Sequence, residues 1–250
     1  MAKPKVAVEL YTLRRVVEQE GLETALRQIA DAGYEGVESG DLLASGEVED
    51  VRGLFDRLGL RCAGVHLGYE QVADPDSPLQ FLEEMGSKYF IVSGVGNFKT
   101  KGMRAFEEAA DLFNKAARAF ASMGVVFCYH NHSFEFEEFD GVRGIDRLYE
   151  LTDPKLVKLC LDTYWVRHGE DDPVAFVRKH LARIALVHFK DYRDGEFAEV
   201  GEGEIDFAAL LKELAKIDLE WITVEQDETT RPPSESIALS RRNLRERFEV

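Results

Sequence analysis

The chain has 250 residues, of which 45% are hydrophobic and 31% charged, and its formal net charge is −16 at pH 7. This composition is that of an ordinary folded globule, and the length fits one α/β domain over residues 1–250. The acidic balance disfavours nucleic acid as a partner, and no apolar run approaches the roughly 20 residues that span a bilayer. The amino-terminal stretch shows no secretory signal pattern, and three cysteines suit a reducing compartment, so we expect a cytoplasmic protein that does not bind membranes.

Strand-like and helix-like patterns alternate eight times along the chain. Gly33 and Gly59 follow helical stretches and are typical of helix C-terminal caps, and we expect Ser77 to cap a helix whose first residue is Pro78. The predicted strands are residues 5–10, 35–39, 61–66, 88–96, 125–132, 155–162, 183–189 and 220–225, and the predicted helices are residues 20–33, 48–60, 78–87, 103–123, 144–152, 172–182, 207–217 and 234–248.

This alternation favours a (β/α)8 TIM barrel. A doubly wound open sheet is the alternative, but it would be expected to show a glycine-rich phosphate loop after the first strand, and the stretch LYTLRR has no glycine. In a barrel, functional side chains gather at the carboxyl ends of the strands.

Four predicted strands end in side chains that commonly bind metals. The stretch FCYHNHSFEF carries His130 and His132, which point to the same side of a strand because they are two residues apart. Later strands end at Asp162, His188 and Glu225. A single buried histidine or acid is often a structural feature, but hydrophobic strands have no structural need for four polar ends. The set therefore predicts a functional site.

The three cysteines, Cys62, Cys128 and Cys160, each lie an even number of residues before a site candidate. Period-two alternation would turn all three inward, as small side chains beneath the site.

The ordered series LYTLR, GYEGVE, YHNHSFEF, LDTYW, VHFKD, VGEGEID and VEQD resembles the xylose isomerase-like TIM barrels, the superfamily of sugar phosphate isomerases and epimerases. The resemblance covers nearly the whole chain, and the YHNHSFEF stretch is similar to that of the inosose dehydratase-like branch. It implies an enzyme that acts on a small sugar or polyol, and a possible homodimer.

The resemblance also implies one divalent metal ion, usually held by Glu, Asp, His and Glu from the fifth to eighth strands. Asp162, His188 and Glu225 match the last three positions, and His130 stands where many relatives have Glu. Nitrogen and oxygen donors without thiolate suit Mn²⁺, Zn²⁺, Co²⁺ or Fe²⁺.

His132 and Glu135 remain alternatives to His130 as the first ligand. Because the carboxylate of the fifth strand is replaced, a symmetrical two-base epimerase is disfavoured. Dehydration or isomerisation of a keto-sugar or keto-inositol is the reaction that we expect.

Other side chains near the strand ends are candidates for catalysis. Glu225 would also handle a proton, and Lys190 would hold a substrate oxygen or stabilise an enediolate, unless it only pairs with Asp191. His66 would act as the general acid or bind a hydroxyl, with a structural histidine as the alternative, and Glu38 would act on or contact the substrate.

Further candidates would bind the substrate. Arg14 would contact an anion, but a single cation is weak evidence for a phosphate, so an unphosphorylated substrate is favoured. His168 and His180 are expected at the surface. The predicted substrate contacts are Glu9, Tyr11, Arg14, His132, Tyr164 and Trp165.

Two other functions fit the same barrel. One is a non-catalytic or regulatory sugar-binding barrel, which need not keep Asp162, His188 and Glu225 together. The other is an apurinic-site endonuclease, which the acidic balance and the six histidines disfavour.

Overall fold

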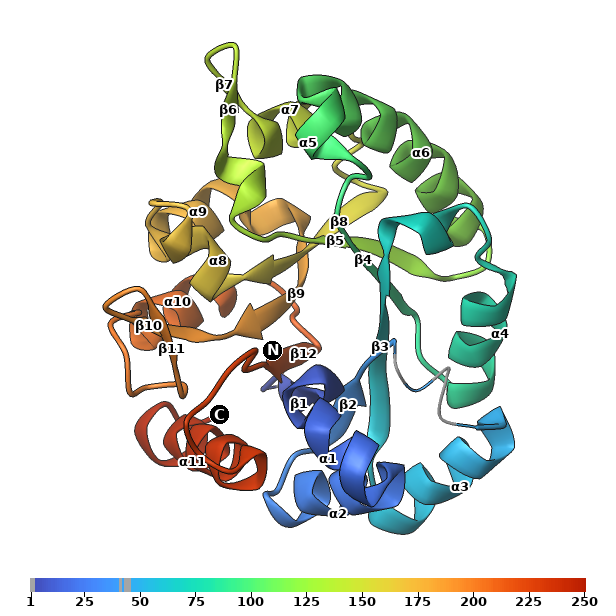
Figure 1. The fold of residues 1–250 in the computed structure, drawn as a ribbon, viewed down its shortest axis with the longest axis vertical. Helices are drawn as coiled ribbons and strands as arrows, with labels where there is room; N and C mark the ends of the chain where they lie inside the picture. Colours follow the sequence, from blue (N-terminus) through green and yellow to red (C-terminus); the bar gives the residue numbers. More distant parts are fainter. Residues whose placement is uncertain (1–2, 41, 43–45) are drawn as a thin grey trace.

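The structure, a computed structural model, describes residues 3–40, 42 and 46–250. Eight parallel strands close into a barrel, and helices surround it (Figure 1), which confirms the predicted TIM barrel. Within the described residues, no helix is long and apolar enough to cross a membrane. The barrel strands are β1 (Lys5–Glu9), β2 (Gly36–Glu38), β3 (Arg61–Gly68), β4 (Tyr89–Ser93), β5 (Val126–His130), β8 (Val157–Asp162), β9 (Ile184–Phe189) and β12 (Trp221–Val224).

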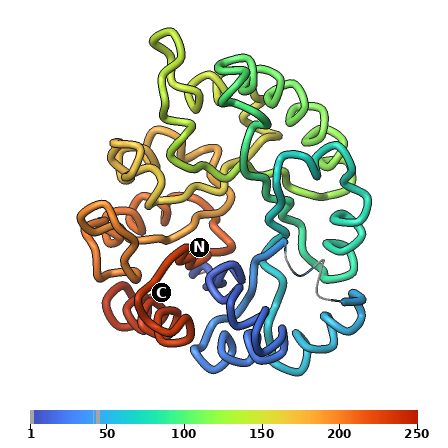
Figure 2. The backbone as a smooth tube through the Cα atoms, viewed as in Figure 1, coloured from blue at the N-terminus to red at the C-terminus, as the bar shows by residue number. Residues whose placement is uncertain are grey.

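The barrel closes where the two ends of the chain meet. Strand β1 pairs in parallel with β12, with Val6 opposite Ile222, and Figure 2 shows the blue amino-terminal part beside the red carboxyl-terminal part. All eight strands therefore end at the same side of the barrel. The helices are α1 (Arg14–Glu20), α2 (Leu22–Asp31), α3 (Val48–Leu58), α4 (Asp76–Met85), α5 (Phe98–Lys101), α6 (Met103–Ala121), α7 (Gly144–Leu151), α8 (Thr163–His168), α9 (Pro173–His180), α10 (Phe207–Leu214) and α11 (Pro233–Arg247).

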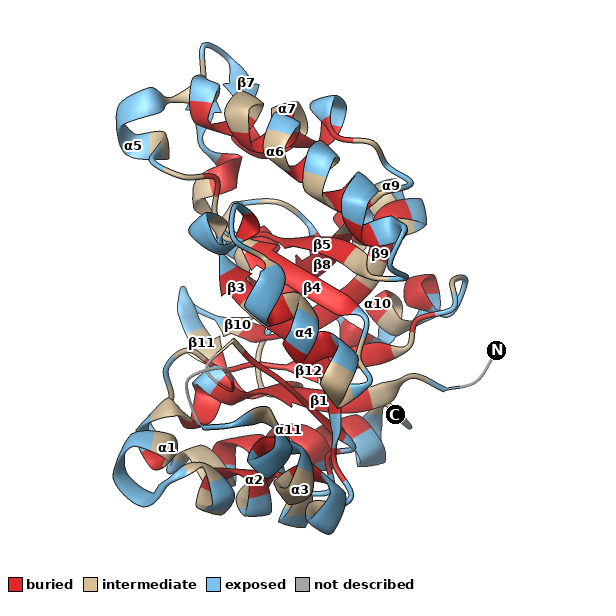
Figure 3. Cartoon of the chain, turned by 90° about the vertical axis from the view of Figure 1, so that its right-hand side faces the viewer, coloured by how far each residue is buried: buried red, intermediate tan, exposed pale blue. Residues whose placement is uncertain are grey.

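The core has two layers because strand side chains alternate between the barrel interior and the helices. Figure 3 shows buried strands and helices that are buried on the side facing them. The larger layer lies between strands and helices, and a smaller cluster inside the barrel includes Cys128 and Cys160, as predicted.

A register shift between β2 and β3 changes the orientation of side chains along β3. Val37 pairs with Cys62, but Glu38 pairs with Gly64, so β3 contains one extra residue at this point. Cys62 belongs to the layer between strands and helices, and the prediction that it points inward was wrong. Beyond the shift, the ring of His66 faces the barrel interior, with its centroid 4.7 Å from that of His130.

Several boundaries differ from the predictions. Helix α1 lies where no helix was predicted, and Gly21, with φ of 89°, separates it from α2, which corresponds to the predicted helix 20–33. Helix α4 begins at Asp76, so Ser77 lies inside its first turn and does not cap it. His168 is exposed as predicted, but His180 is half-buried. Its ring packs against the rings of Phe176 and Tyr149, with centroids 4.5 and 5.0 Å away.

Helix α8 and two small hairpins lie in stretches where no helix or strand was predicted. The hairpins are β6 (Glu138–Phe139) with β7 (Val142–Arg143), and β10 (Asp191–Arg193) with β11 (Glu196–Ala198). The second of these hairpins directly follows β9 and lies beside the candidate site.

Candidate metal and substrate site

Four side chains converge at the carboxyl ends of neighbouring strands β5, β8, β9 and β12. Each of them offers one ligand atom, and the four atoms all lie within 4.8 Å of one another. All four side chains are buried. They are His130, Asp162, His188 and Glu225, the predicted set.

The orientation of Asp162 follows from its place at the end of β8. Its Oδ1 accepts the backbone N–H of Trp165 at 2.8 Å and so caps helix α8. Its backbone N–H donates to the side-chain oxygen of Asn131 at 3.0 Å, which ties β8 to the end of β5. The second oxygen, Oδ2, is directed to the cluster and lies 3.4 Å from Nε2 of His130.

His130 has the properties of a side chain that could bind a metal ion. Both ring nitrogens are buried and, within the described part of the chain, neither forms a hydrogen bond. Burial lowers the pKa of His130 well below its usual range, and the nearby His188 lowers it further, so the ring is a neutral imidazole with a free lone pair. Leaving such a group unpaired costs about 1–3 kcal/mol, and a divalent ion would satisfy it. The donor set therefore fits a metal.

His188 lies between two carboxylates. Its Nδ1 is 2.9 Å from Oε2 of Glu225, and its Nε2 is 2.7 Å from Oε1 of Glu38. Burial lowers the pKa of His188, but Cys160 and Glu38 outweigh burial and raise it well above the usual range. With one ring nitrogen on a metal, the other would donate its N–H to a carboxylate, an arrangement common in metal sites.

Glu38 is thus placed beneath the site, in contact with a ligand. Its other oxygen, Oε2, accepts the hydroxyl of Thr223 at 2.9 Å, and its side chain is 0% exposed. A second group of possible ligands, Glu38 with His66 and His188, shares His188 with the first. Because a neutral imidazole has one free ring lone pair, His188 can bind a metal in only one of the two groups. The group of four side chains offers more donor atoms and is therefore favoured.

Lys190 supplies a positive charge to the same carboxylates. Its Nζ lies 2.9 Å from Oε2 of Glu225, 3.2 Å from Oδ2 of Asp162 and 2.8 Å from Oδ2 of Asp227. Burial lowers the pKa of Lys190, but these carboxylates raise it by more, so the ammonium stays charged. The same ammonium lowers the pKa of Glu225 against the opposing effect of burial.

Asp191, the alternative partner predicted for Lys190, binds backbone N–H groups instead. Its carboxylate accepts the backbone N–H groups of Tyr192, Gly201, Gly203 and Ile205. It therefore fixes the loop that carries the β10–β11 hairpin.

A pocket of about 540 Å³ lies beside the cluster and reaches two of its members. The predicted residues Glu9, Tyr11, His66, His132 and Trp165 line it. Phe197, from the hairpin, also lines it, with its ring centroid 5.7 Å from that of Trp165. Sequence reasoning missed Phe197 because only the fold of the hairpin brings it to the pocket.

Two predicted substrate contacts lie behind the pocket wall. The hydroxyl of Tyr164 donates to the carbonyl of Gly195, and the buried ring stacks on Phe197 at 4.1 Å. The guanidinium of Arg14 donates to Glu228 at 2.7 Å and to the backbone carbonyl of Asp227. These two side chains support the residues that line the pocket.

Glu135 lies away from the ligand cluster. Its Oε1 accepts the hydroxyl of Tyr129 at 2.7 Å, and its Oε2 accepts the backbone N–H of His132 at 2.9 Å. Burial raises the pKa of Glu135 to about 8. Glu135 fixes the chain after β5, whereas His130 belongs to the group of four side chains that could hold a metal.

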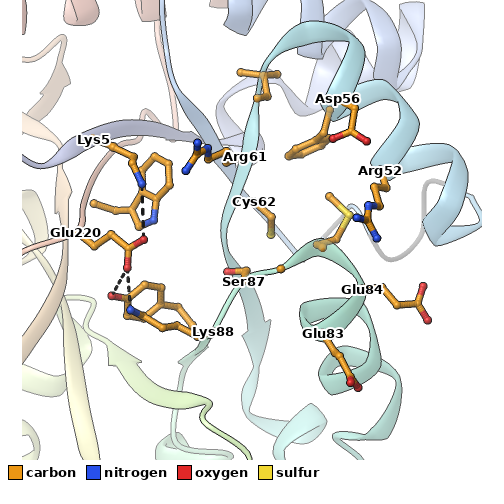
Figure 4. Close-up of a pocket in the computed structure, with 16 residues that line it drawn as sticks. Lys5, Arg52, Asp56, Arg61, Cys62, Glu83, Glu84, Ser87, Lys88 and Glu220 are labelled. Carbon is orange, nitrogen blue, oxygen red and sulfur yellow. Dashed lines mark hydrogen bonds and ion pairs between the residues drawn. The ribbon is translucent and has the colours of Figure 1, made fainter.

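Another pocket, of about 460 Å³, lies at the opposite end of the barrel. Figure 4 shows Glu220 between Lys5 and Lys88, with Glu83 and Glu84 on helix α4. Four basic and four acidic side chains line this pocket, so their charges balance, and the amino ends of barrel strands usually serve stability. We assign the chemistry to the carboxyl ends.

Comparison with known proteins identifies the family. The model of the xylose isomerase-like TIM barrel matches residues 26–247, so the chain belongs to that family. An inosose dehydratase of Geobacillus kaustophilus is 28% identical, with 82% of this chain and 80% of the relative covered. An inosose dehydratase of Clostridium tetani is 30% identical, with 68% of each chain covered. A solved structure described as a sugar phosphate isomerase/epimerase from Parabacteroides distasonis superposes with a TM-score of 0.81, at 24% identity, covering 97% of this chain and 94% of that one.

Proposed function

We propose that the protein is a divalent-metal-dependent enzyme that dehydrates or isomerises a keto-sugar or keto-inositol, with dehydration favoured. The convergence of His130, Asp162, His188 and Glu225 beside a polar and aromatic pocket carries this proposal. The names of the curated relatives, inosose dehydratases, support a cyclic polyol ketone as the substrate class.

The pocket lining supports an uncharged substrate. Among the described residues that line it are the acids Glu9, Glu225, Asp227 and Glu228, and no lysine or arginine. A phosphate group would meet negative charge without a compensating cation. Trp165 and Phe197 offer apolar ring surfaces to the C–H face of a sugar or inositol ring.

Different residues of the site would contribute to removing a proton from the carbon next to the substrate carbonyl. The four ligands would hold a divalent ion, which would polarise the substrate carbonyl and acidify the neighbouring C–H bond. Glu225 lines the pocket and stays ionised, so its carboxylate serves as the base for that proton. The Lys190 ammonium, which pairs with Asp162 and Glu225 behind the pocket lining, would help to stabilise negative charge that develops on the substrate oxygen.

Metal analysis of the purified protein, followed by a screen of keto-inositols and 3-keto-sugars, tests this proposal. We expect turnover that a chelator abolishes and added Mn²⁺ or Co²⁺ restores. Asp162→Asn keeps the oxygen that caps α8 and removes the ligand oxygen, so the variant should fold, bind metal weakly and lack activity. Failure of the metal-loaded protein to turn over any carbonyl sugar, or full activity of Asp162→Asn, would refute the proposal.

A further inference from the structure

Glu9, at the end of β1, is a buried carboxyl group of the pocket that the ligand cluster does not use. The residue is 4% exposed and lines the pocket. Its Oε1 accepts the backbone N–H of Tyr11 at 3.4 Å. Its Oε2 is buried and, among the residues that the structure describes, forms no hydrogen bond. This oxygen is therefore available to a ligand.

Both ring nitrogens of the neighbouring His66 already have polar partners. Its Nδ1 lies 3.3 Å from Oε1 of Glu38 but 3.8 Å from Oε2 of Glu9, and its Nε2 is 3.2 Å from the hydroxyl of Ser93. The shorter distance joins His66 to Glu38, whose other oxygen is bound by Thr223. The arrangement leaves Glu9 as the group with a free polar atom.

The surroundings of Glu9 favour its protonated form. Burial raises the pKa of Glu9 well above the usual range, and the carboxylates of Glu38 and Glu225 raise it further. A neutral carboxylic acid in a pocket can donate a proton, as a carboxylate cannot. Glu225, on the adjacent strand β12, has the opposite tendency and stays ionised.

We infer that Glu9 is the general acid that protonates the departing hydroxyl group, so that the reaction of this site is loss of water. This inference rests on the proposed function, which it narrows. The base Glu225 takes the proton from the carbon next to the carbonyl, and that electron pair forms a C=C bond as the adjacent C–O bond breaks. The Glu9 proton moves to the leaving oxygen, which departs as water. Glu225 then releases its proton to solvent and solvent reprotonates Glu9, so the enzyme is restored and the substrate has lost H₂O without oxidation or reduction.

Glu9→Gln tests the role because the amide keeps the shape of the side chain and cannot give up a proton. With the metal-loaded enzyme and a keto-inositol that it dehydrates, we expect the variant to lose dehydration by about 100-fold or more. It should still exchange the substrate proton next to the carbonyl with deuterium from D₂O, because Glu225 performs that step. An analogue with fluoride in place of the leaving hydroxyl should restore elimination, because fluoride departs without a proton.

The matched control is Glu18→Gln, at an exposed position of helix α1, which should leave all three rates unchanged. Near-normal dehydration by Glu9→Gln, or equal loss of exchange and dehydration, would overturn the inference. Absence of both reactions in the unsubstituted enzyme would instead refute the proposed function. If Glu9→Gln does not fold, ¹³C NMR of the Glu9 carboxyl in the unsubstituted enzyme decides. A protonated group at neutral pH supports the inference, and an ionised one overturns it.

Discussion

Nε2 of His188 lies 2.7 Å from Oε1 of Glu38, although the two residues are 150 positions apart in the chain. The contact crosses the interior of the barrel from β9 to β2. Since Nδ1 of the same ring faces Glu225 at 2.9 Å, Glu38 fixes which nitrogen His188 presents to the ligand cluster.

Substitution of Glu38 should therefore weaken metal binding without removing a ligand. We expect Glu38→Ala to lower metal affinity by about 10- to 100-fold. Glu38→Gln should lose less, because its amide oxygen can still accept the N–H of His188. Titration calorimetry with Mn²⁺ measures both, with the exposed Glu49→Gln as the control. Unchanged affinity in Glu38→Ala would contradict this role.

Lys190→Met should destabilise the metal-free protein and make it more responsive to metal. The substitution leaves the buried carboxylates of Asp162 and Glu225, and the half-buried carboxylate of Asp227, without their cation, at a cost of about 3–5 kcal/mol. A bound divalent ion would offset part of that loss.

Thermal unfolding with and without Mn²⁺ measures the effect of Lys190→Met. The variant should show a lower melting temperature and a larger rise on adding metal than the unsubstituted protein. Lys212→Met, at an exposed position of α10, should change neither quantity. An equal rise in both proteins would argue against electrostatic coupling of Lys190 to the cluster.

Glu135→Gln should remove part of the pH dependence of stability. The pKa of Glu135 is raised from 4.5 to about 8, so the folded state favours the protonated form. The contribution of protonated Glu135 to the free energy of unfolding is present in full below pH 4.5. It is lost as the pH rises through about 8. Over that window the free energy of unfolding should fall, by at most about 1.4 kcal/mol per pH unit, relative to the variant.

Urea unfolding at a series of pH values measures this difference. Glu138→Gln, a few residues along at an exposed position, should keep the pH dependence of the unsubstituted protein. Parallel curves for Glu135→Gln and the unsubstituted protein would show that Glu135 does not change its protonation in this range.

Truncation of the aromatic wall should affect substrate binding more than catalysis. We expect Trp165→Ala and Phe197→Ala each to raise KM by up to about tenfold, since an aromatic contact contributes about 0.5–1.5 kcal/mol. Metal affinity should not change. Tyr164→Phe keeps the ring that stacks on Phe197 and should leave KM nearly unchanged. A fall in kcat alone would place the two rings in a different role.

The sequence allowed the barrel and the convergence of the four side chains to be predicted because both depend on local patterns. Apolar strands that end in His130, Asp162, His188 and Glu225 carry their own signal, and parallel closure brings those ends together. The contact between Glu38 and His188 has no such signal, since it depends on which strands face each other across the barrel.

Features that depend on register or on loops escaped prediction. The extra residue in β3 reversed the orientation expected for Cys62, and no alternation rule reveals a register shift. Phe197 reaches the pocket only because Asp191 gathers four backbone N–H groups of its loop. The unpaired oxygen of Glu9 could not be predicted, because it depends on the partners that His66 has in the folded chain.

The four side chains that could hold a metal all come from residues 130–225, whereas Glu9, Glu38 and His66 come from the first three strands. In the proposed reaction the later strands would supply the metal ligands and the base Glu225, and the first strand would supply the acid Glu9. Related chains could diversify their reactions by altering Glu9 on the first strand while retaining Glu38 and the later strands, which would keep the metal-binding group and change the product.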